Sequence, residues 1–315
     1  ILNLQHIYKD YNQDKLVVPV LKDVSLQVEE GEYVAIMGPS GSGKTTIGRA
    51  ITRINPVSAG EILYRGKRIS GKISKDLDRE VVKTCQMIFQ NPYSSLNPRM
   101  TVKDIVGEGL KQHGMSTKDA DAKVEQLLAT VGLNKDHMSR FPHEFSGGQR
   151  QRIGIARALS VDPEFIICDE PISALDVSIQ AQVINMLKEL QEERGLTYLF
   201  IAHDLSVVKY ISDRVVVMYL GTMVETAETD ELYAHPMHPY TQALLSAIPE
   251  ADPNKAKANQ RIPIKGEIPS PINPKNCCRF AERCQHATER CFKEMPQMKE
   301  IAPGHKVACH LVEDK

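Results

Sequence analysis

The stretch Gly38-Pro39-Ser40-Gly41-Ser42-Gly43-Lys44-Thr45 decides the fold of this 315-residue chain. It follows the apolar run Tyr33–Met37, which has the composition of a strand, and it opens a segment of helical pattern that reaches about Arg53. A strand, a glycine-rich loop ending in Lys-Thr and a helix in succession fit the pattern of a phosphate-binding loop in full. A surface turn of glycine and serine would match this pattern, in this context, only by rare chance. We therefore predict a site for a nucleoside triphosphate.

The residue types of this loop assign the chemistry. Glycines let successive backbone N–H groups turn toward phosphates, and the start of the helix adds positive potential. Lys44 is expected to reach the β- and γ-phosphates, and the Thr45 hydroxyl to bind Mg²⁺. The predicted nucleotide contacts here are Gly38, Pro39, Ser40, Gly41, Ser42, Gly43, Lys44, Thr45 and Thr46. The loop alone leaves kinases, GTPases, helicases and transport ATPases open.

A second apolar run, 165–168, ends in the two carboxylates Asp169 and Glu170. In a parallel sheet these side chains lie at the carboxyl edge, where ligands bind. Asp169 is predicted to hold Mg²⁺, and Glu170 to orient or deprotonate the water that attacks the γ-phosphate. His203 and Gln90 follow two further strand-like runs and are candidates to contact the γ-phosphate and to join the Mg²⁺ and water shell, respectively. The plainer interpretations are a strand ending in solvated acids, a structural histidine and a turn glutamine.

The remaining pattern predicts an α/β protein. Strand-like runs at 198–201 and 215–218 and the helical stretch 177–194 alternate as in a parallel sheet. Residues 91–160 have mostly helical periodicity and are expected to form an inserted helical lobe. Prolines become frequent from Pro236 onward, so we predict one domain over 1–234 and an irregular extension over 235–315.

The bulk composition is that of an ordinary soluble globular protein. The chain is 42% hydrophobic and 25% charged, and its formal net charge is -1. This balance gives no general electrostatic attraction to nucleic acid or to an anionic membrane. No run of about 18 apolar residues and no secretory leader is visible, so we expect neither a membrane span nor export.

The stretch Phe145-Ser146-Gly147-Gly148-Gln149 opens another helical segment. A serine and two glycines at a helix start make a second anion site, which a chain with its own phosphate loop needs only if it faces another subunit's ATP. The stretch resembles the signature of ABC ATPases, which usually have leucine in place of Phe145. The resemblance implies two subunits that sandwich two ATP molecules head to tail, and an N-terminal antiparallel β subdomain beside the parallel core. It further implies that Tyr11 stacks on adenine, that Gln90 is the Q-loop glutamine, that Ser173-Ala174-Leu175-Asp176 forms the D-loop and that His203 is the switch histidine.

Two more stretches resemble the F-type ATP-binding subunit of dipeptide and oligopeptide permeases. These are 91–100 and His238-Pro239-Tyr240-Thr241. The second is by itself also typical of a proline-bounded helix start. The resemblance implies a peripheral subunit at the cytoplasmic face of the cell membrane, with a D-type ATPase, two membrane subunits and, indirectly, an extracytoplasmic peptide-binding protein as partners, and with no nucleic acid. Related systems carry nickel, glutathione or other small solutes. A non-transport ABC ATPase is the other alternative, although no tandem cassette or basic surface is visible.

Five of the seven cysteines lie in the last forty residues. Cys278, Cys284, Cys291 and Cys309 have the spacing that binds a [4Fe-4S] cluster in the permease subunits that this chain resembles. Thiolates suit zinc as well, and His305 and His310 flank the last cysteine. Free or disulfide-bonded cysteines are the third interpretation, which a reducing cytosol disfavours. Cys277 stands where the family more often has glycine and is expected not to be a ligand.

Overall fold

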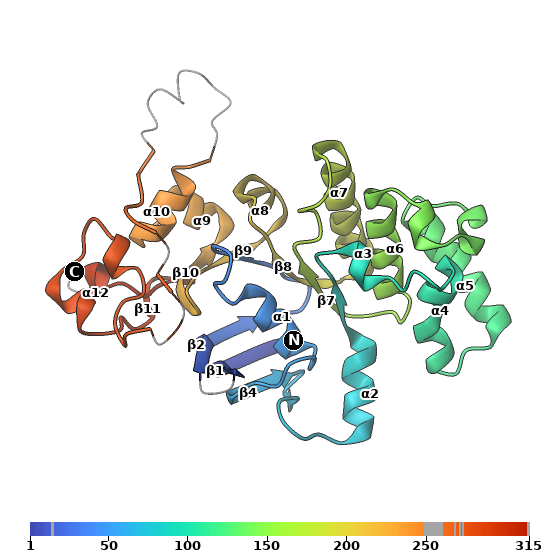
Figure 1. Cartoon of the computed structure of the whole chain (residues 1–315), viewed down its shortest axis with the longest axis horizontal. Helices are drawn as coiled ribbons and strands as arrows, with labels where there is room; N and C mark the ends of the chain where they lie inside the picture. The colour runs from blue at the N-terminus through green and yellow to red at the C-terminus, as the bar shows by residue number, and fades with distance from the viewer. Residues whose placement is uncertain (14–15, 249–260, 268, 271, 273, 314–315) are drawn as a thin grey trace. The chain divides into compact units, whose positions relative to one another are not determined.

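The computed structural model describes residues 1–13, 16–248, 261–267, 269–270, 272 and 274–313 (Figure 1). The contacts divide the chain into two compact units. The first comprises residues 1–28, 33–71 and 202–315, and the second comprises residues 29–32 and 72–201.

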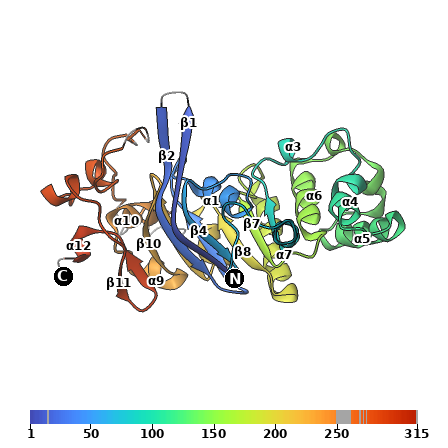
Figure 2. The same cartoon turned by 90° about the horizontal axis from the view of Figure 1, so that it is seen from below.

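The first unit contains the predicted antiparallel β subdomain. Its four strands lie in the order β2-β1-β4-β5, with β1 at Leu2–Gln13, β2 at Leu16–Val28, β4 at Ala59–Tyr64 and β5 at Lys67–Arg68. The long hairpin of β1 and β2 is paired from Leu2 opposite Val28 to Gln13 opposite Leu16 (Figure 2). Alternate side chains of these strands, including Leu2, Leu4 and Leu26, are buried, as expected for a sheet with one covered face.

The same unit contributes the strand order β11-β12-β10-β9-β3 to a second sheet. Here β3 (Tyr33–Met37) runs parallel to β9 (Arg214–Tyr219), and β10 (Thr222–Glu228) is antiparallel to β9. The helices are α1 (Lys44–Ile51), α8 (Leu205–Ile211), α9 (Thr229–Ala234), α10 (Pro239–Leu245) and α12 (His310–Glu313). The helix α1 ends two residues earlier than predicted, since Arg53 has left-handed backbone geometry with φ 62°.

The cysteine-bearing extension is irregular over much of its described length, with the short 3₁₀ turns η3 (Ala281–Arg283) and η4 (Glu289–Phe292). It also adds two strands that the sequence analysis did not predict, β11 (Lys299–Ala302) and β12 (His305–Val307). Strand β12 pairs antiparallel with β10. Strands of four and three residues are too short to show an alternating pattern.

The second unit holds three parallel strands in the order β8-β7-β6: β6 (Cys85–Ile88), β7 (Phe165–Asp169) and β8 (Thr197–Ile201). All five residues of β7 and of β8 are buried, which explains their continuous apolar sequence. Helix α7 occupies Val177–Arg194, the predicted range.

The predicted helical lobe forms from α3 (Pro92–Ser95), α4 (Val102–Gln112), α5 (Thr117–Thr130), η1 (Lys135–Ser139), η2 (Pro142–Glu144) and α6 (Gly147–Leu159). The helix α2 (Lys75–Thr84) was not predicted, because its ten residues include only three apolar ones, Leu77, Val81 and Val82, of which only Val81 is buried. The α/β architecture predicted from the sequence is confirmed. Among the described residues, no helix has both the length and the apolar character needed to cross a membrane.

Candidate functional site

The phosphate loop joins β3 to α1 within the first unit (Figure 1). Gly38 has φ 152°, and a Cβ atom there would lie 2.3 Å from the Met218 carbonyl oxygen. Gly43 has φ 97°, and a Cβ atom there would lie 2.9 Å from the Val20 carbonyl oxygen. Because both contacts are too close for any side chain, these two glycines are required by packing as well as by backbone conformation.

Polar groups converge inside this loop. Lys44, only 4% exposed, donates from Nζ to the carbonyl oxygens of Gly38 at 2.8 Å and Pro39 at 3.1 Å. Ser42 is fully buried, and its hydroxyl has no hydrogen-bond partner among the described residues. A buried hydroxyl without a partner costs free energy, so a phosphate oxygen that accepts from Ser42 fits this position. The loop thus offers an ammonium, a hydroxyl and a helix start to an anionic ligand.

Tyr11 on β1 also belongs to the first unit. Its hydroxyl accepts a hydrogen bond from Asn55 Nδ2 at 2.9 Å, and Lys9 Nζ lies 4.7 Å from the ring centroid. Lys9 is itself held by a hydrogen bond to the Pro56 carbonyl oxygen at 2.7 Å. The ring is therefore held at its hydroxyl and on one face, which gives it a defined orientation. His203, the predicted switch histidine, is exposed just after β8.

Gln90 and Glu170 meet in the second unit. Gln90 Nε2 donates to Glu170 Oε2 at 2.6 Å, and Glu170 is 8% exposed. Glu170 has φ 48°, a left-handed conformation that costs a non-glycine residue about 1 kcal/mol. Its backbone N–H donates to the Ile201 carbonyl oxygen, and its own carbonyl oxygen accepts from the Ser173 hydroxyl. The turn after β7 thus presents a strained, partly buried carboxylate, which is typical of functional positions. The neighbouring Asp169 ends β7 and is 2% exposed.

The signature stretch starts α6 as the sequence analysis predicted. Ser146 is the N-cap: its hydroxyl accepts from the Gln149 backbone N–H at 3.3 Å, and the Gln149 side chain accepts from the Ser146 backbone N–H at 3.0 Å. A Cβ atom at Gly148 would lie 2.6 Å from Ile179 Cγ2, so close packing against α7 requires glycine there. An open pocket of about 680 Å³ lies against this helix start, with Ser146, Gly148, Gln149 and Arg152 in its wall.

The predicted D-loop leads into α7. Asp176 caps this helix, accepting hydrogen bonds from the Ile179 backbone N–H at 3.0 Å and the Ser178 hydroxyl at 2.8 Å. The Ile179 bond, followed by the Ser178 bond, lowers the pKa of Asp176 below its usual value. Gln180 Nε2 donates to the carbonyl oxygens of Ile172 and Leu175, which fixes the path of the loop.

A contact between the signature helix and the 91–100 stretch was not predicted from the sequence. The Arg150 guanidinium lies 3.8 Å from the centroid of the Tyr93 ring, and the same group donates to the carbonyl oxygens of Pro142 and His143. Tyr93 is nevertheless 65% exposed. The two residues are far apart in the sequence, and no local pattern connects them.

The His-Pro-Tyr stretch begins α10, as its plainer interpretation predicted. His238 is the N-cap, and its Nδ1 accepts from the Tyr240 backbone N–H at 3.0 Å. Complete burial lowers the pKa of His238 to about 3, so its imidazole is neutral near pH 7. Tyr240 packs against Tyr219 and Phe280, with ring centroids 4.7 and 5.3 Å away. Because Phe280 belongs to the extension, this stretch also anchors the cysteine-bearing segment.

The four predicted cysteine ligands all belong to the first unit, and the charges of Cys284, Cys291 and Cys309 act on Cys278. Each sulfur accepts a backbone N–H: Cys278 from Phe280, Cys284 from His286, Cys291 from Thr288 and Cys309 from Leu311. Burial raises the pKa of the Cys278 thiol to about 12, and the charges of the other three cysteines raise it further. N–H donors aimed at sulfur favour thiolates, the form in which cysteine binds iron-sulfur clusters and zinc alike. Cys277 instead directs its thiol toward the Cys278 carbonyl oxygen at 3.9 Å.

The structure confirms neither the iron-sulfur nor the zinc interpretation. In the part of the chain that the structure describes, no group of three or more His, Cys, Asp or Glu residues is arranged to hold a metal ion. Both ring nitrogens of His305 face carboxylates, and His310 Nε2 lies 3.2 Å from the Glu294 carbonyl oxygen.

A buried carboxylate, Glu225 on β10, is a further feature that the sequence analysis missed. Its Oε1 lies 2.8 Å from His305 Nε2, and both side chains are almost completely buried. The same carboxylate accepts from the backbone N–H groups of Met237 at 2.7 Å and His238 at 3.0 Å. Glu225 therefore ties strand β10 to both the start and the end of the extension.

Comparisons with known proteins agree with these motifs. Residues 21–173 match the family described as ABC transporter, and residues 224–291 match the one described as oligopeptide/dipeptide transporter, C-terminal region. The chain is 53% identical over 302 residues to the putative oligopeptide transport ATP-binding protein YkfD of Bacillus subtilis (strain 168), covering 94% of this chain and 91% of the relative. It is 54% identical over 295 residues to the oligopeptide transport ATP-binding protein AppF of the same organism, covering 93% of this chain and 90% of the relative.

Among solved structures, the chain resembles the ATP-binding cassette MJ0796 in a dimeric, post-hydrolysis state bound to ADP and Pi. The TM-score is 0.67 at 29% sequence identity, over 73% of this chain and 99% of that one. The match to near full-length relatives is close enough to fix the family. The chain belongs to the ABC transporter ATP-binding proteins, in the group that carries the oligopeptide/dipeptide transporter C-terminal region.

Proposed function

We propose that this chain is the ATP-hydrolysing subunit of an importer for dipeptides or oligopeptides. It acts with a second ATP-binding subunit of the D-type beneath two membrane subunits, at the cytoplasmic face of the cell membrane. The relatives named above are oligopeptide transport ATP-binding proteins, which supports this cargo over nickel, glutathione or another solute. An extracytoplasmic binding protein delivers the peptide.

In the proposed reaction, ATP binds at the phosphate loop. Lys44 neutralises the β- and γ-phosphates, the backbone N–H groups of 38–45 surround them, and Tyr11 stacks on adenine. Thr45, Gln90 and Asp169 offer the oxygen ligands that Mg²⁺ prefers, and the ion supplies charge neutralisation between the phosphates. His203 contacts the γ-phosphate. Ser146, Gly147, Gly148, Gln149 and Asp176 serve the ATP held by the partner subunit.

Glu170 is the proposed general base. The hydrogen bond from Gln90 Nε2 to Glu170 Oε2, 2.6 Å long, carries this proposal because it ties the carboxylate to one predicted Mg²⁺ ligand. Glu170 takes a proton from the attacking water, and the oxygen of that water forms the bond to the γ-phosphorus as the bond to ADP breaks. The strain at φ 48° is consistent with a carboxylate held in place for this purpose.

Glu170→Gln tests the general base. Glutamine preserves the size and can still accept from Gln90, but it cannot take a proton. We expect ATP turnover to fall by about 10²–10⁴-fold while ATP binding persists, so that ATP accumulates in a stable dimer with the partner subunit. Turnover by phosphate release and dimer formation by size-exclusion chromatography with ATP measure both effects.

The matched control is Glu192→Gln, which changes an exposed glutamate of α7 and is expected to leave turnover unchanged. Retained steady-state hydrolysis in Glu170→Gln would refute the assigned base. A wild-type subunit that never co-purifies with integral membrane proteins would instead refute the transporter assignment and favour a non-transport ATPase.

We further propose that Cys278, Cys284, Cys291 and Cys309 hold a [4Fe-4S] cluster. The four N–H donors to sulfur support the proposal. Anaerobic purification should yield about four iron and four sulfide per chain in the wild type and in Cys277→Ser, and a large loss in Cys284→Ser. Zinc alone in the anaerobic wild-type protein would overturn the assignment.

A further inference from the structure

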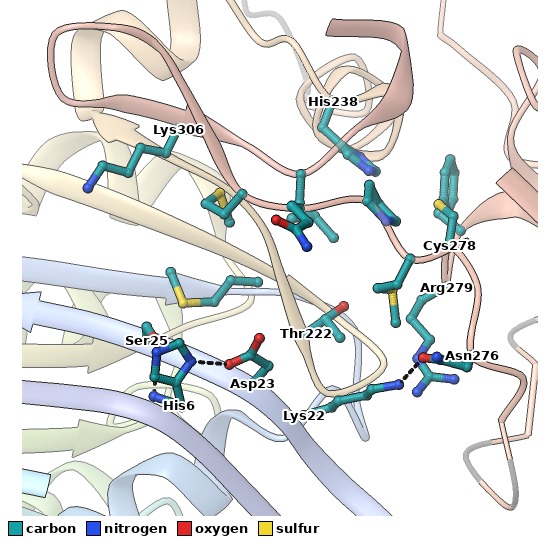
Figure 3. A pocket seen from close by; sticks show the side chains of 18 of the residues that line it. His6, Lys22, Asp23, Ser25, Thr222, His238, Asn276, Cys278, Arg279 and Lys306 are labelled. Carbon is teal, nitrogen blue, oxygen red and sulfur yellow. Dashed lines mark hydrogen bonds and ion pairs between the residues drawn. The ribbon is translucent and has the colours of Figure 1, made fainter. Parts of the chain in front are cut away.

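The first unit contains a cavity of about 940 Å³, separate from the phosphate loop (Figure 3). Its wall comes from the β1–β2 hairpin, from strand β10 and from the extension. Pockets that bind small molecules typically measure about 300–1,000 Å³, so this one has the size for a ligand of several residues. No role proposed above uses it.

Two cations lie together at one end of this cavity, Lys22 of β2 and Arg279 of the extension (Figure 3). Lys22 Nζ donates to Asn276 Oδ1 at 2.5 Å, and Arg279 Nη1 donates to the Lys275 carbonyl oxygen at 2.8 Å. Both acceptors are neutral, and among the described residues neither cation forms an ion pair. Arg279 Nε is buried and has no hydrogen-bond partner in the part of the chain that the structure describes.

Burial and then the neighbouring Arg279 charge lower the pKa of Lys22, and the Asp23 charge offsets this only in part. The two cations therefore repel each other in a partly desolvated place, with a guanidinium N–H left unsatisfied. An anion between them would remove the repulsion and supply acceptors, and a planar carboxylate suits a guanidinium in particular.

The cavity is not the space of the proposed iron-sulfur cluster. Of the four proposed cysteine ligands only Cys278 lines it, whereas a cluster would need all four sulfurs. The cations of the cavity therefore need a ligand of their own.

The rest of the wall is amphipathic. Met223, Met295 and Met298 supply flexible apolar side chains that adapt to varied groups. Asp23, held by His6 at 2.7 Å, and Glu300 place carboxylates elsewhere on the wall. A ligand that fits this cavity has an anionic group for the two cations and an apolar body for the methionines. It can also carry a positive group, which would face the carboxylates.

We propose that this cavity binds a short apolar peptide, with its C-terminal carboxylate on Lys22 and Arg279 and its ammonium toward Asp23 or Glu300. A fatty acid shares the carboxylate and the apolar body but offers nothing to the acidic groups. Inorganic phosphate offers nothing to the methionines. The peptide is the ligand class that uses all three kinds of wall.

Backbone hydrogen bonds hold the main chain at Lys22 in place. Its backbone N–H donates to the Gly221 carbonyl oxygen at 2.9 Å, and the Gly221 N–H donates to the Ser42 carbonyl oxygen at 3.1 Å. The cavity wall is thus two backbone hydrogen bonds from the phosphate loop. Lys22 itself has no part in the proposed nucleotide chemistry, so changing its side chain leaves that site intact.

Calorimetric titration of the full chain, without nucleotide, tests the proposal with trileucine, trileucine amide, octanoate and inorganic phosphate as probes. We expect trileucine to bind with a dissociation constant below about 1 mM, and the amide to bind at least about tenfold more weakly. Lys22→Met and Arg279→Gln should each weaken trileucine binding by about tenfold or more, and Lys22→Arg should restore it. The exposed residues Lys67 and Arg261 provide the matched controls Lys67→Met and Arg261→Gln, which should bind like the wild type.

Retained ATP binding in each variant shows that the first unit is folded, and the absence of nucleotide in the titration keeps the result independent of the proposed ATPase roles. Equal binding of trileucine to wild type and Lys22→Met, or no binding at millimolar concentration, would overturn the proposal. Octanoate or phosphate binding as tightly as trileucine would overturn the peptide assignment.

Discussion

Removal of the His305 imidazole should destabilise the first unit by about 3 kcal/mol. His305 Nε2 lies 2.8 Å from Glu225 Oε1, and the two side chains are 1% and 0% exposed. Removing the partner of a buried charged group costs about 3–5 kcal/mol, because the Glu225 carboxylate stays in a medium of low dielectric constant without its contact to His305. The low end applies to His305→Ala, since the N–H groups of Met237 and His238 still donate to Glu225.

Urea unfolding monitored by circular dichroism measures this change. The control His235→Ala removes an exposed histidine 3.1 Å from Glu231 and should cost less than about 1 kcal/mol. In the double variant Glu225→Gln/His305→Ala the buried group is neutral but still accepts from both N–H groups, so we expect it to be more stable than His305→Ala. The reasoning fails if His305→Ala costs no more than His235→Ala, or if the double variant is no more stable than the single one.

Two further predictions concern packing and protonation. Gly148→Ala should cost about 1–3 kcal/mol, since its Cβ would lie 2.6 Å from Ile179 Cγ2, and Ile179→Ala should relieve most of this cost in the double variant; thermal unfolding that shows no such coupling would contradict the close contact. Burial lowers the pKa of His238 from 6.5 to about 3. Because the unfolded chain binds a proton at His238 more readily than the folded one, the free energy of unfolding is highest above pH 6.5 and decreases as the pH falls toward 3. Between pH 7 and 5 the wild type should therefore lose about 2 kcal/mol more than His238→Asn, which keeps the helix cap without titrating; parallel pH profiles would contradict the lowered pKa.

The elements that the sequence predicted well are those with strong local patterns. Strand β3 and helix α7 have the predicted ends, because a fully buried strand is continuously apolar and because Asp176 and Gly195 mark the two ends of the helix. The phosphate loop and the signature stretch could also be predicted from the sequence, because the functional residues of each motif are consecutive. Their assigned roles in catalysis stay predictions until the variants above are measured.

The features that the sequence did not predict depend on contacts between distant residues. Glu225 and His305 are 80 positions apart, and neither has a neighbour in sequence that marks it as half of a buried pair. The Arg150–Tyr93 contact and the cation pair of Lys22 and Arg279 are of the same kind. In helix α2 and strands β11 and β12 the missing signal was local, because these elements are short or mostly exposed.

The His238-Pro239-Tyr240 stretch both starts helix α10 and belongs to the C-terminal region that identifies the family. His238 caps α10 with its side chain and donates its backbone N–H to Glu225, while Tyr240 packs on Phe280, two residues after Cys278. The same carboxylate binds His305, four residues before Cys309. The segment 238–305, which carries three of the four proposed cluster ligands, is therefore closed at both ends on one buried glutamate, and Cys309 follows four residues later; this closure lowers the entropy cost of bringing the sulfurs together. Loss of His305 should then weaken cluster retention as well as the fold, although His305 is not itself a ligand.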